Sequence, residues 1–194
     1  MNVLKRKNKK PIVYAFIDSQ NLNLGVQKVG WKMDWRALRV YLKDKYNVSK
    51  AFMFIGYIVE NESLYEHLHE LGYLIVLKPT VDVSTSQDSS HEINNEEHKS
   101  VVKGNIDADL VLYAMKELPN YNKAIIVSGD GDFVSLVEYL AENNKLLHIM
   151  TPNWQYSSLL KPWDKYIIRI DQLRKQLAYK DYSHKKKNRN NQDD

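Results

Sequence analysis

Five aspartates fall where neighbouring elements of a fold could bring their carboxylates together. Asp18 ends an apolar run, Asp130 and Asp132 directly follow another, and Asp107 and Asp109 stand in the first turn of a helical pattern. Carboxylates that meet repel each other, which destabilises a fold unless a cation neutralises them. Because the chain has no cysteine and no paired histidines at ligand spacing, we expect Mg²⁺ or Mn²⁺ rather than a softer metal.

Each of these aspartates also has a purely structural interpretation. Asp18 and Asp132 could cap the helices that follow them, and the neighbouring glycines could serve only a tight turn. Asp107 and Asp109 could simply favour the positive end of a helix dipole. The coincidence of all five at strand ends or helix starts favours a metal site over separate caps.

Helix geometry separates Asp107 from Asp109. Positions two apart on an α-helix point about 200° away from each other. Asp107 lies on an apolar stripe that must face the core, whose other members are Leu110, Val111 and Ala114. Asp109 lies on a more mixed face. We therefore expect Asp107 to be the ligand and Asp109 to be the second choice.

The elements that would position these residues alternate between strand and helix patterns. Apolar runs rich in Val, Ile, Tyr and Phe predict strands at 12–17, within 48–59, and at 73–77, 124–127, 146–150 and 166–170. Helical spacing and cap residues predict helices from about 19, from 34, and over 61–72, 106–118, 133–142 and 171–179. This alternation indicates an α/β fold, with a mainly parallel sheet of five to six strands and helices on both faces. Ligands of such sheets bind beyond the carboxyl ends of the strands, where Asp18 and Asp130 would lie.

The size of the chain, 194 residues with 43% hydrophobic content, suits one globular domain. We expect that domain to span residues 11–180, with a polar, mobile loop at 80–100. No apolar run approaches the roughly 18 residues of a membrane-spanning helix. The short apolar run after the basic N-terminal residues has no signal-peptide cleavage site. A cytoplasmic protein without membrane contact is therefore expected.

Positive charge is concentrated at the two ends of the chain. Residues 1–10 carry a net charge of +5 and residues 185–194 carry +2, which leaves −3 for the remainder out of a total of +4. We expect basic disordered tails at 1–10 and 181–194. Such arms attract polyanions, which makes nucleic acid a reasonable partner, although they could equally serve only solubility.

Three segments together are similar to the signature motifs of a known family. They are 16–22 (Phe-Ile-Asp-Ser-Gln-Asn-Leu), 103–107 (Lys-Gly-Asn-Ile-Asp) and 127–133 (Val-Ser-Gly-Asp-Gly-Asp-Phe). In this order they resemble the three blocks of the NYN domain, the LabA-like branch of the PIN-like nucleases. The similarity spans residues 12–171. One departure is that many relatives carry a further aspartate where this chain has Leu112-Tyr113-Ala114.

The resemblance implies a Rossmann-like, PIN-like fold with an acidic pocket for Mg²⁺ or Mn²⁺ and single-stranded or structured RNA as the substrate. It implies an acidic set, for catalysis and metal binding, that consists of Asp18, Asp107, Asp130 and Asp132. It also implies two polar groups that support the site and the substrate, Asn21 and Ser128, and a phosphate-facing cation, Lys103. Together these groups would hydrolyse RNA phosphodiesters.

The leading hypothesis from the sequence is therefore a metal-dependent endoribonuclease. Its alternative is a non-catalytic RNA-binding or regulatory NYN module that keeps the metal pocket, which the departure at Tyr113 favours. A protein scaffold and a phosphatase for small phosphoesters are further alternatives, and the oligomeric state is open. Three aromatic residues could stack on bases or could instead lie in the core: Trp154, Tyr156 and Trp163.

Overall fold

Alternating strands and helices build the fold, as a computed structural model of residues 10–79 and 106–180 describes it. The loop expected at 80–100, Lys103 and, apart from residue 10, the two expected tails lie outside the described residues. The strands are β1 (Val13–Asp18), β2 (Val48–Tyr57), β3 (Leu74–Pro79), β4 (Lys123–Val127), β5 (Leu146–Thr151) and β6 (Ile167–Arg169). The α-helices are α1 (Ser19–Lys28), α2 (Trp35–Tyr46), α3 (Glu62–Glu70), α4 (Ile106–Lys116), α5 (Val134–Glu142) and α6 (Arg174–Leu177). Short 3₁₀ helices connect them: η1 (Val59–Asn61), η2 (Leu118–Asn120), η3 (Gly131–Phe133), η4 (Ser158–Tyr166) and η5 (Ile170–Leu173).

Within the described residues, six strands form one sheet in the order β3-β2-β1-β4-β5-β6. Each neighbouring pair is parallel, so the predicted α/β class with a parallel sheet is confirmed. The chain begins in the middle of the sheet at β1, builds outward to β3, and then returns to place β4 on the other side of β1. This reversal of direction puts the switch point, where open α/β sheets bind ligands, at the carboxyl ends of β1 and β4.

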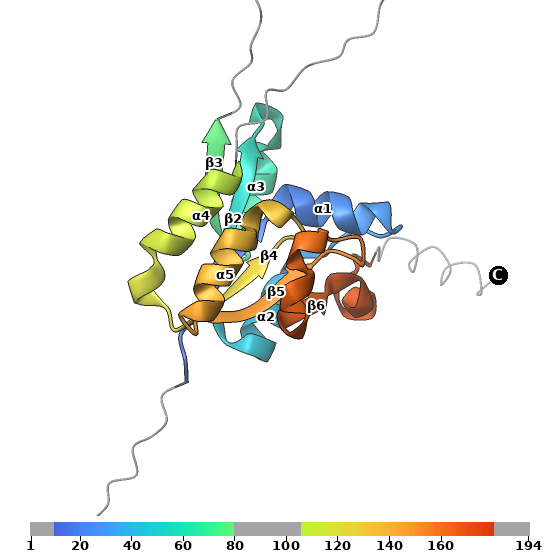
Figure 1. Ribbon diagram of the computed structural model, residues 1–194. Coiled ribbons are helices and arrows are strands. Elements are labelled where there is room, and N and C mark those ends of the chain that lie inside the picture. The colour runs from blue at the N-terminus through green and yellow to red at the C-terminus, as the bar shows by residue number, and fades with distance from the viewer. Residues whose placement is uncertain (1–9, 80–105, 181–194) are drawn as a thin grey trace, which may run out of the picture.

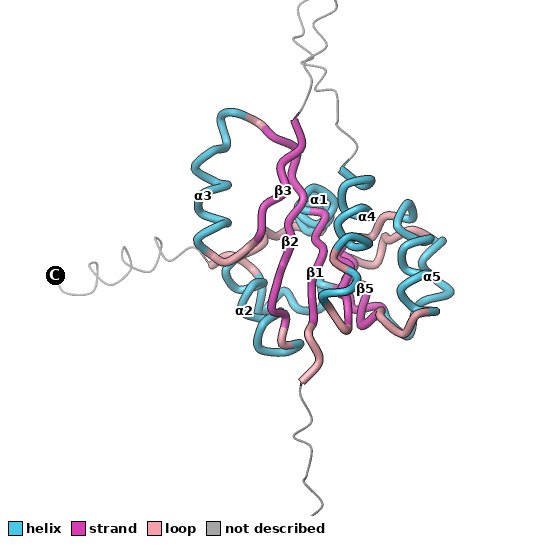
Figure 2. Tube along the Cα trace, turned by 90° about the vertical axis from the view of Figure 1, so that its left-hand side faces the viewer, coloured by secondary structure: helices cyan, strands magenta, loops and turns pink. Residues whose placement is uncertain are grey.

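Helices cover both faces of the sheet (Figures 1 and 2). Figure 2 shows α2 and α3 on one side and α4 and α5 on the other. Successive residues of a strand point to opposite faces. Ile17 accordingly packs in a core cluster with Leu38 of α2, whereas Phe16 packs in the opposite cluster with Leu110 of α4 and Val137 of α5. Because both layers are apolar, all six residues of β1, Asp18 included, are buried.

One local prediction from the sequence is wrong. The expected helix at 171–179 is a 3₁₀ helix followed by an α-helix that ends at Leu177, because Ala178 leaves helical geometry to pair with Met33 in a β-bridge. On α3, Leu64 is exposed. Tyr65 is buried instead, and its hydroxyl accepts the backbone N–H of Ile58 at 2.9 Å.

No helix in the described part of the chain has both the length and the apolar character that crossing a membrane requires.

Candidate functional site

Asp18 is both a helix cap and a member of an acidic site. It is the last residue of β1 and the N-cap of α1, and its Oδ1 accepts the backbone N–H of Asn21 at 3.0 Å. Its Oδ2 lies 3.3 Å from the hydroxyl oxygen of Ser128, which donates to it. The side chain is 6% exposed. Capping and site formation are therefore compatible here, since each carboxylate oxygen has its own partner.

The loop after β4 folds back on itself through its own polar groups. Ser128 is 1% exposed, and its Oγ accepts the backbone N–H of Asp130 at 3.1 Å. Asp130 in turn caps η3, because its Oδ1 accepts the backbone N–H of Asp132 at 3.1 Å. These bonds hold the Asp130 carboxylate at the carboxyl end of β4, beside the end of β1.

Asn21 ties this loop to α1. Its Oδ1 accepts the backbone N–H of Gly129 at 2.9 Å, across 108 positions of the sequence. Since the carbonyl oxygen is used in this way, the amide nitrogen of Asn21 is the group that can donate to a ligand. The side chain lines the same cavity as Asp18.

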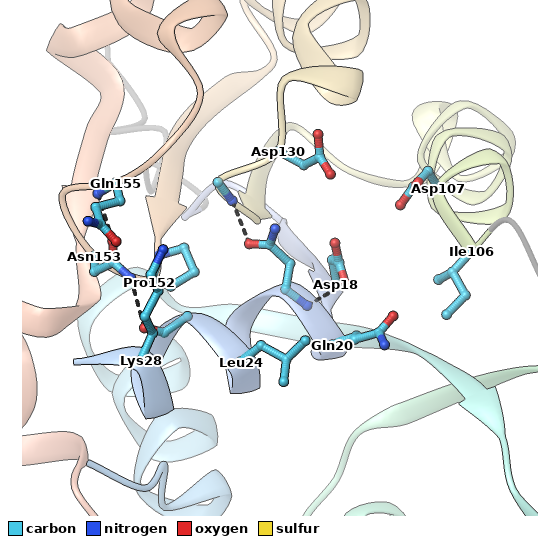
Figure 3. A pocket seen from close by; sticks show the side chains of 13 residues that line it. Asp18, Gln20, Leu24, Lys28, Ile106, Asp107, Asp130, Pro152, Asn153 and Gln155 are labelled. Atoms are coloured by element: carbon cyan, nitrogen blue, oxygen red, sulfur yellow. Dashed lines mark hydrogen bonds between the residues drawn. The ribbon is translucent and has the colours of Figure 1, made fainter. Parts of the chain in front are cut away.

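Three of the predicted aspartates line one cavity of about 270 Å³: Asp18, Asp107 and Asp130. They come from β1, from the start of α4 and from the loop after β4, and Figure 3 shows them around one side of the cavity. Asn21 and Lys28 of α1 line it as well. The structure thus brings together residues that are more than 100 positions apart in the sequence.

Other candidates lie elsewhere. Asp109 forms an ion pair with Lys78 of β3, at 3.0 Å, and does not line the cavity. Asp107 does line the cavity, and its role as a ligand stays a prediction. Asp132 is exposed and also absent from the lining, so its role as a ligand stays a prediction. Ser128 lies beneath the cavity rather than on its wall.

Burial raises the pKa of the Asp18 carboxyl above its ordinary value. Repulsion from the carboxylates of Asp107 and Asp130 acts in the same direction. The hydrogen bonds from the Asn21 N–H and the Ser128 hydroxyl lower this pKa and only partly offset the other effects. The cavity therefore concentrates negative charge at a cost that a bound cation would remove.

The comparison of sequences identifies the family. Residues 13–171 match the profile of the NYN domain. The chain belongs to the NYN domain family. It is 25% identical over 157 residues to the low amplitude and bright protein LabA of Synechococcus elongatus, an alignment that covers 78% of this chain and 80% of that protein. The resemblance seen in the three sequence motifs is thereby confirmed.

A solved structure shares the fold of this NYN domain. The crystal structure of a protein of unknown function from Vibrio parahaemolyticus superposes with a TM-score of 0.64 at 20% sequence identity. The match covers 89% of this chain and 99% of that chain. At this level of identity the likeness concerns the fold alone.

The donors of the NYN cavity fit a hydrated divalent cation better than a closed ligand cage. Over residues 10–79 and 106–180, no three His, Cys, Asp or Glu side chains lie close enough together to form a metal cluster. Mg²⁺ commonly keeps several waters and binds through one or two carboxylates together with substrate phosphates. A cavity with carboxylate and amide oxygens on its wall suits that mode and offers no soft ligand.

Sequence reasoning missed the wall that the β5–η4 loop contributes to the NYN site. Asn153 is 5% exposed; its Nδ2 donates to the Gly25 carbonyl at 2.7 Å, and its Oδ1 accepts the Gln155 N–H at 2.6 Å. Pro152 packs so closely on α1 that a Cβ at Gly25 would lie 2.4 Å from the Pro152 Cβ. A glycine inside an amphipathic helix was the available signal for this close approach.

Proposed function

We propose that this NYN domain is an endoribonuclease that hydrolyses RNA phosphodiesters with the help of Mg²⁺ or Mn²⁺. The observation that carries the proposal is the convergence of Asp18, Asp107 and Asp130 on one cavity at the switch point of the sheet. Membership in the NYN family, whose fold is that of PIN-like nucleases, supports it.

Asp18, Asp107 and Asp130 would hold the hydrated ion, either directly or through its water molecules. When bound there, the ion would neutralise their charge, lower the pKa of a water molecule and offset the charge that develops on the phosphate. Asp18 is fitted to this task because its two hydrogen bonds fix the orientation of the carboxylate before anything binds.

The remaining groups of the site either contact the substrate or position the aspartates. Asn21 can donate from its amide nitrogen to a phosphate oxygen or to the attacking water. Lys28, at the other end of α1, supplies a cation on the cavity wall that attracts the RNA phosphate. Ser128 is a positioning residue, since its hydroxyl donates to the Asp18 carboxylate and accepts the backbone N–H of Asp130. Lys103 and Asp132 stay predictions for phosphate contact and charge.

The test is cleavage of labelled RNA by the full chain with Mn²⁺ or Mg²⁺, with and without a chelator. Wild type should cleave only in the presence of the ion. D18N, D107N and D130N should lose cleavage by several orders of magnitude. The matched control is D109N on the same helix as Asp107, which should keep the wild-type rate because Asp109 pairs with Lys78 outside the cavity.

A second candidate function is RNA binding without hydrolysis. It is favoured by the aromatic contacts of Tyr113, whose ring lies 5.6 Å from that of Phe54 and 6.0 Å from that of Phe52, where many relatives carry a further carboxylate. Wild-type protein that binds RNA but leaves it intact with either ion would overturn the nuclease proposal in favour of this one.

A further inference from the structure

A second cavity, of about 330 Å³, adjoins the acidic one. The two cavities share Lys28 and Gln155 on their walls. This size lies within the range of about 300–1,000 Å³ typical of small-ligand clefts. A polymer that places one phosphate at the aspartates could therefore place its next unit in the second cavity.

An exposed indole forms one wall of this second cavity. Trp154 is 55% exposed, and the guanidinium of Arg169 lies 5.7 Å from the centroid of its ring. Arg169 is itself fixed by two bonds to the Asp171 carboxylate, at 3.1 and 2.6 Å. A large, exposed aromatic side chain whose ring contacts a fixed cation is suited to stacking with a nucleobase.

The backbone around Trp154 is held in place before any ligand arrives. The side chain of Asn153, the preceding residue, bonds to the Gly25 carbonyl on one side and to the Gln155 N–H on the other. Asn153 thus bridges α1 and the loop that carries Trp154. A platform fixed in this way loses little conformational entropy when it binds a base.

The remaining walls carry two cations and one carboxylate, that of Asp171, which is paired with Arg169. Lys28 and Arg174 line the cavity, and Arg174 donates from Nη2 to the Gly30 carbonyl at 3.0 Å. A guanidinium has five N–H donors, so this bond leaves others for a phosphate. Trp31 also lines the cavity, and its buried indole N–H has no hydrogen-bond acceptor among the described residues.

Trp154 differs in its exposure from the other two aromatic residues named in the sequence analysis. Tyr156 and Trp163 pack against the core cluster beneath α4 and α5, and the Tyr156 hydroxyl is engaged with Asp164 at 3.1 Å. Of these three side chains, Trp154 alone is more than half exposed and lines a cavity.

We propose that this second cavity binds one nucleotide of single-stranded RNA, with the base stacked on Trp154 and a phosphate held by Lys28 and Arg174. The subsite deepens the proposed function and rests on it for the identity of the ligand as RNA. Paired bases are already stacked within a duplex and cannot offer a free face to Trp154. The subsite therefore selects single strands and leads them to the aspartates.

The first experiment measures binding of a short fluorescent oligouridylate to the full chain in the presence of a chelator. W154A should weaken the affinity roughly 5- to 150-fold, the loss expected for one base–aromatic stack. W154F should recover most of it. The control is Y179A, because Tyr179 is 57% exposed under a comparable cation, Lys32 at 5.4 Å, and lines neither cavity.

Equal affinity of W154A and wild type, or an equal loss in Y179A, would overturn the subsite. Binding of an RNA duplex should change less than threefold in W154A, and a loss as large as that for the single strand would also contradict the proposal.

A second experiment separates the subsite from the proposed catalysis. With Mn²⁺, W154A should raise KM for single-stranded RNA by a factor similar to its loss of affinity and should change kcat much less. Wild type that binds the oligouridylate through Trp154 but does not cleave it would refute the nuclease and leave the subsite standing. Cleavage of RNA by W154A with an unchanged KM would support the nuclease and refute the subsite.

Discussion

The hydroxyl oxygen of Ser128 lies 3.3 Å from Oδ2 of Asp18 and so joins the ends of β1 and β4. The same oxygen accepts the backbone N–H of Asp130 at 3.1 Å. One buried hydroxyl therefore orients two of the three carboxylates that line the acidic cavity. The two ligands proposed for the ion depend on a residue that does not itself reach the cavity.

Replacing Ser128 with alanine should affect both stability and activity. The change leaves a buried carboxylate oxygen and a backbone N–H without their partner, which costs about 1–3 kcal/mol of unfolding free energy. RNA cleavage should fall with it, because the carboxylates lose their fixed orientation. Urea denaturation and the cleavage assay check this. S158A, at an exposed serine of η4, is the control and should match wild type in both.

Replacing Asp18 with asparagine should raise the stability of the metal-free protein at neutral pH. Because the pKa of Asp18 is higher in the folded state than in the unfolded state, the folded protein binds more protons between the two values, and stability falls as pH rises through that window. Asparagine keeps the cap and removes the buried charge. The stability difference between D18N and wild type should therefore be largest at neutral pH and shrink as the pH is lowered toward the unfolded-state pKa.

The control for this measurement is D34N. Asp34 caps α2 as Asp18 caps α1, through Oδ1 and the Ala37 N–H at 3.0 Å, but it does not line the acidic cavity. Urea denaturation of both variants in chelator, at neutral and at acid pH, gives the comparison. A loss of stability in D18N at neutral pH would mean that the charge itself stabilises the fold, which is contrary to our account.

Replacing Gly25 with alanine should displace the loop that walls the acidic cavity. The new Cβ would overlap Pro152, so the loop or α1 must move, at a cost of about 1–3 kcal/mol in unfolding free energy. RNA affinity should fall in parallel, since Asn153 and Trp154 move with the loop. The control is Q27A at an exposed position of the same helix, which should change neither the urea midpoint nor the affinity. If G25A keeps full affinity, the loop does not form part of the binding surface.

Local periodicity was enough to predict much of the fold and part of the site. Strand composition placed Asp18 and Asp130 at the ends of β1 and β4, and parallel strands bring such ends to one edge of a sheet. Helix geometry separated Asp107, which lines the cavity, from Asp109, which pairs with Lys78. These placements depend on rules that act within one element or between neighbouring strands.

Other features depend on contacts between distant segments and could not be predicted from local patterns. Asn153 bonds to a carbonyl 128 positions earlier, and nothing in its immediate sequence indicates that partner. The last helix is short because Ala178 pairs with Met33, which is again a tertiary contact. The exposure of Trp154 depends in the same way on how the loop after β5 docks onto α1.

Binding of a divalent ion by Asp18, Asp107 and Asp130 can be measured by titrating the full chain with Mn²⁺ and recording the electron paramagnetic resonance signal of the free ion. We predict that wild type removes this signal in a saturable manner and that D18N, D107N and D130N each weaken the binding at least tenfold. D109N should bind as wild type does. Identical titrations for wild type and the three cavity variants would contradict the claim that these carboxylates share one divalent ion.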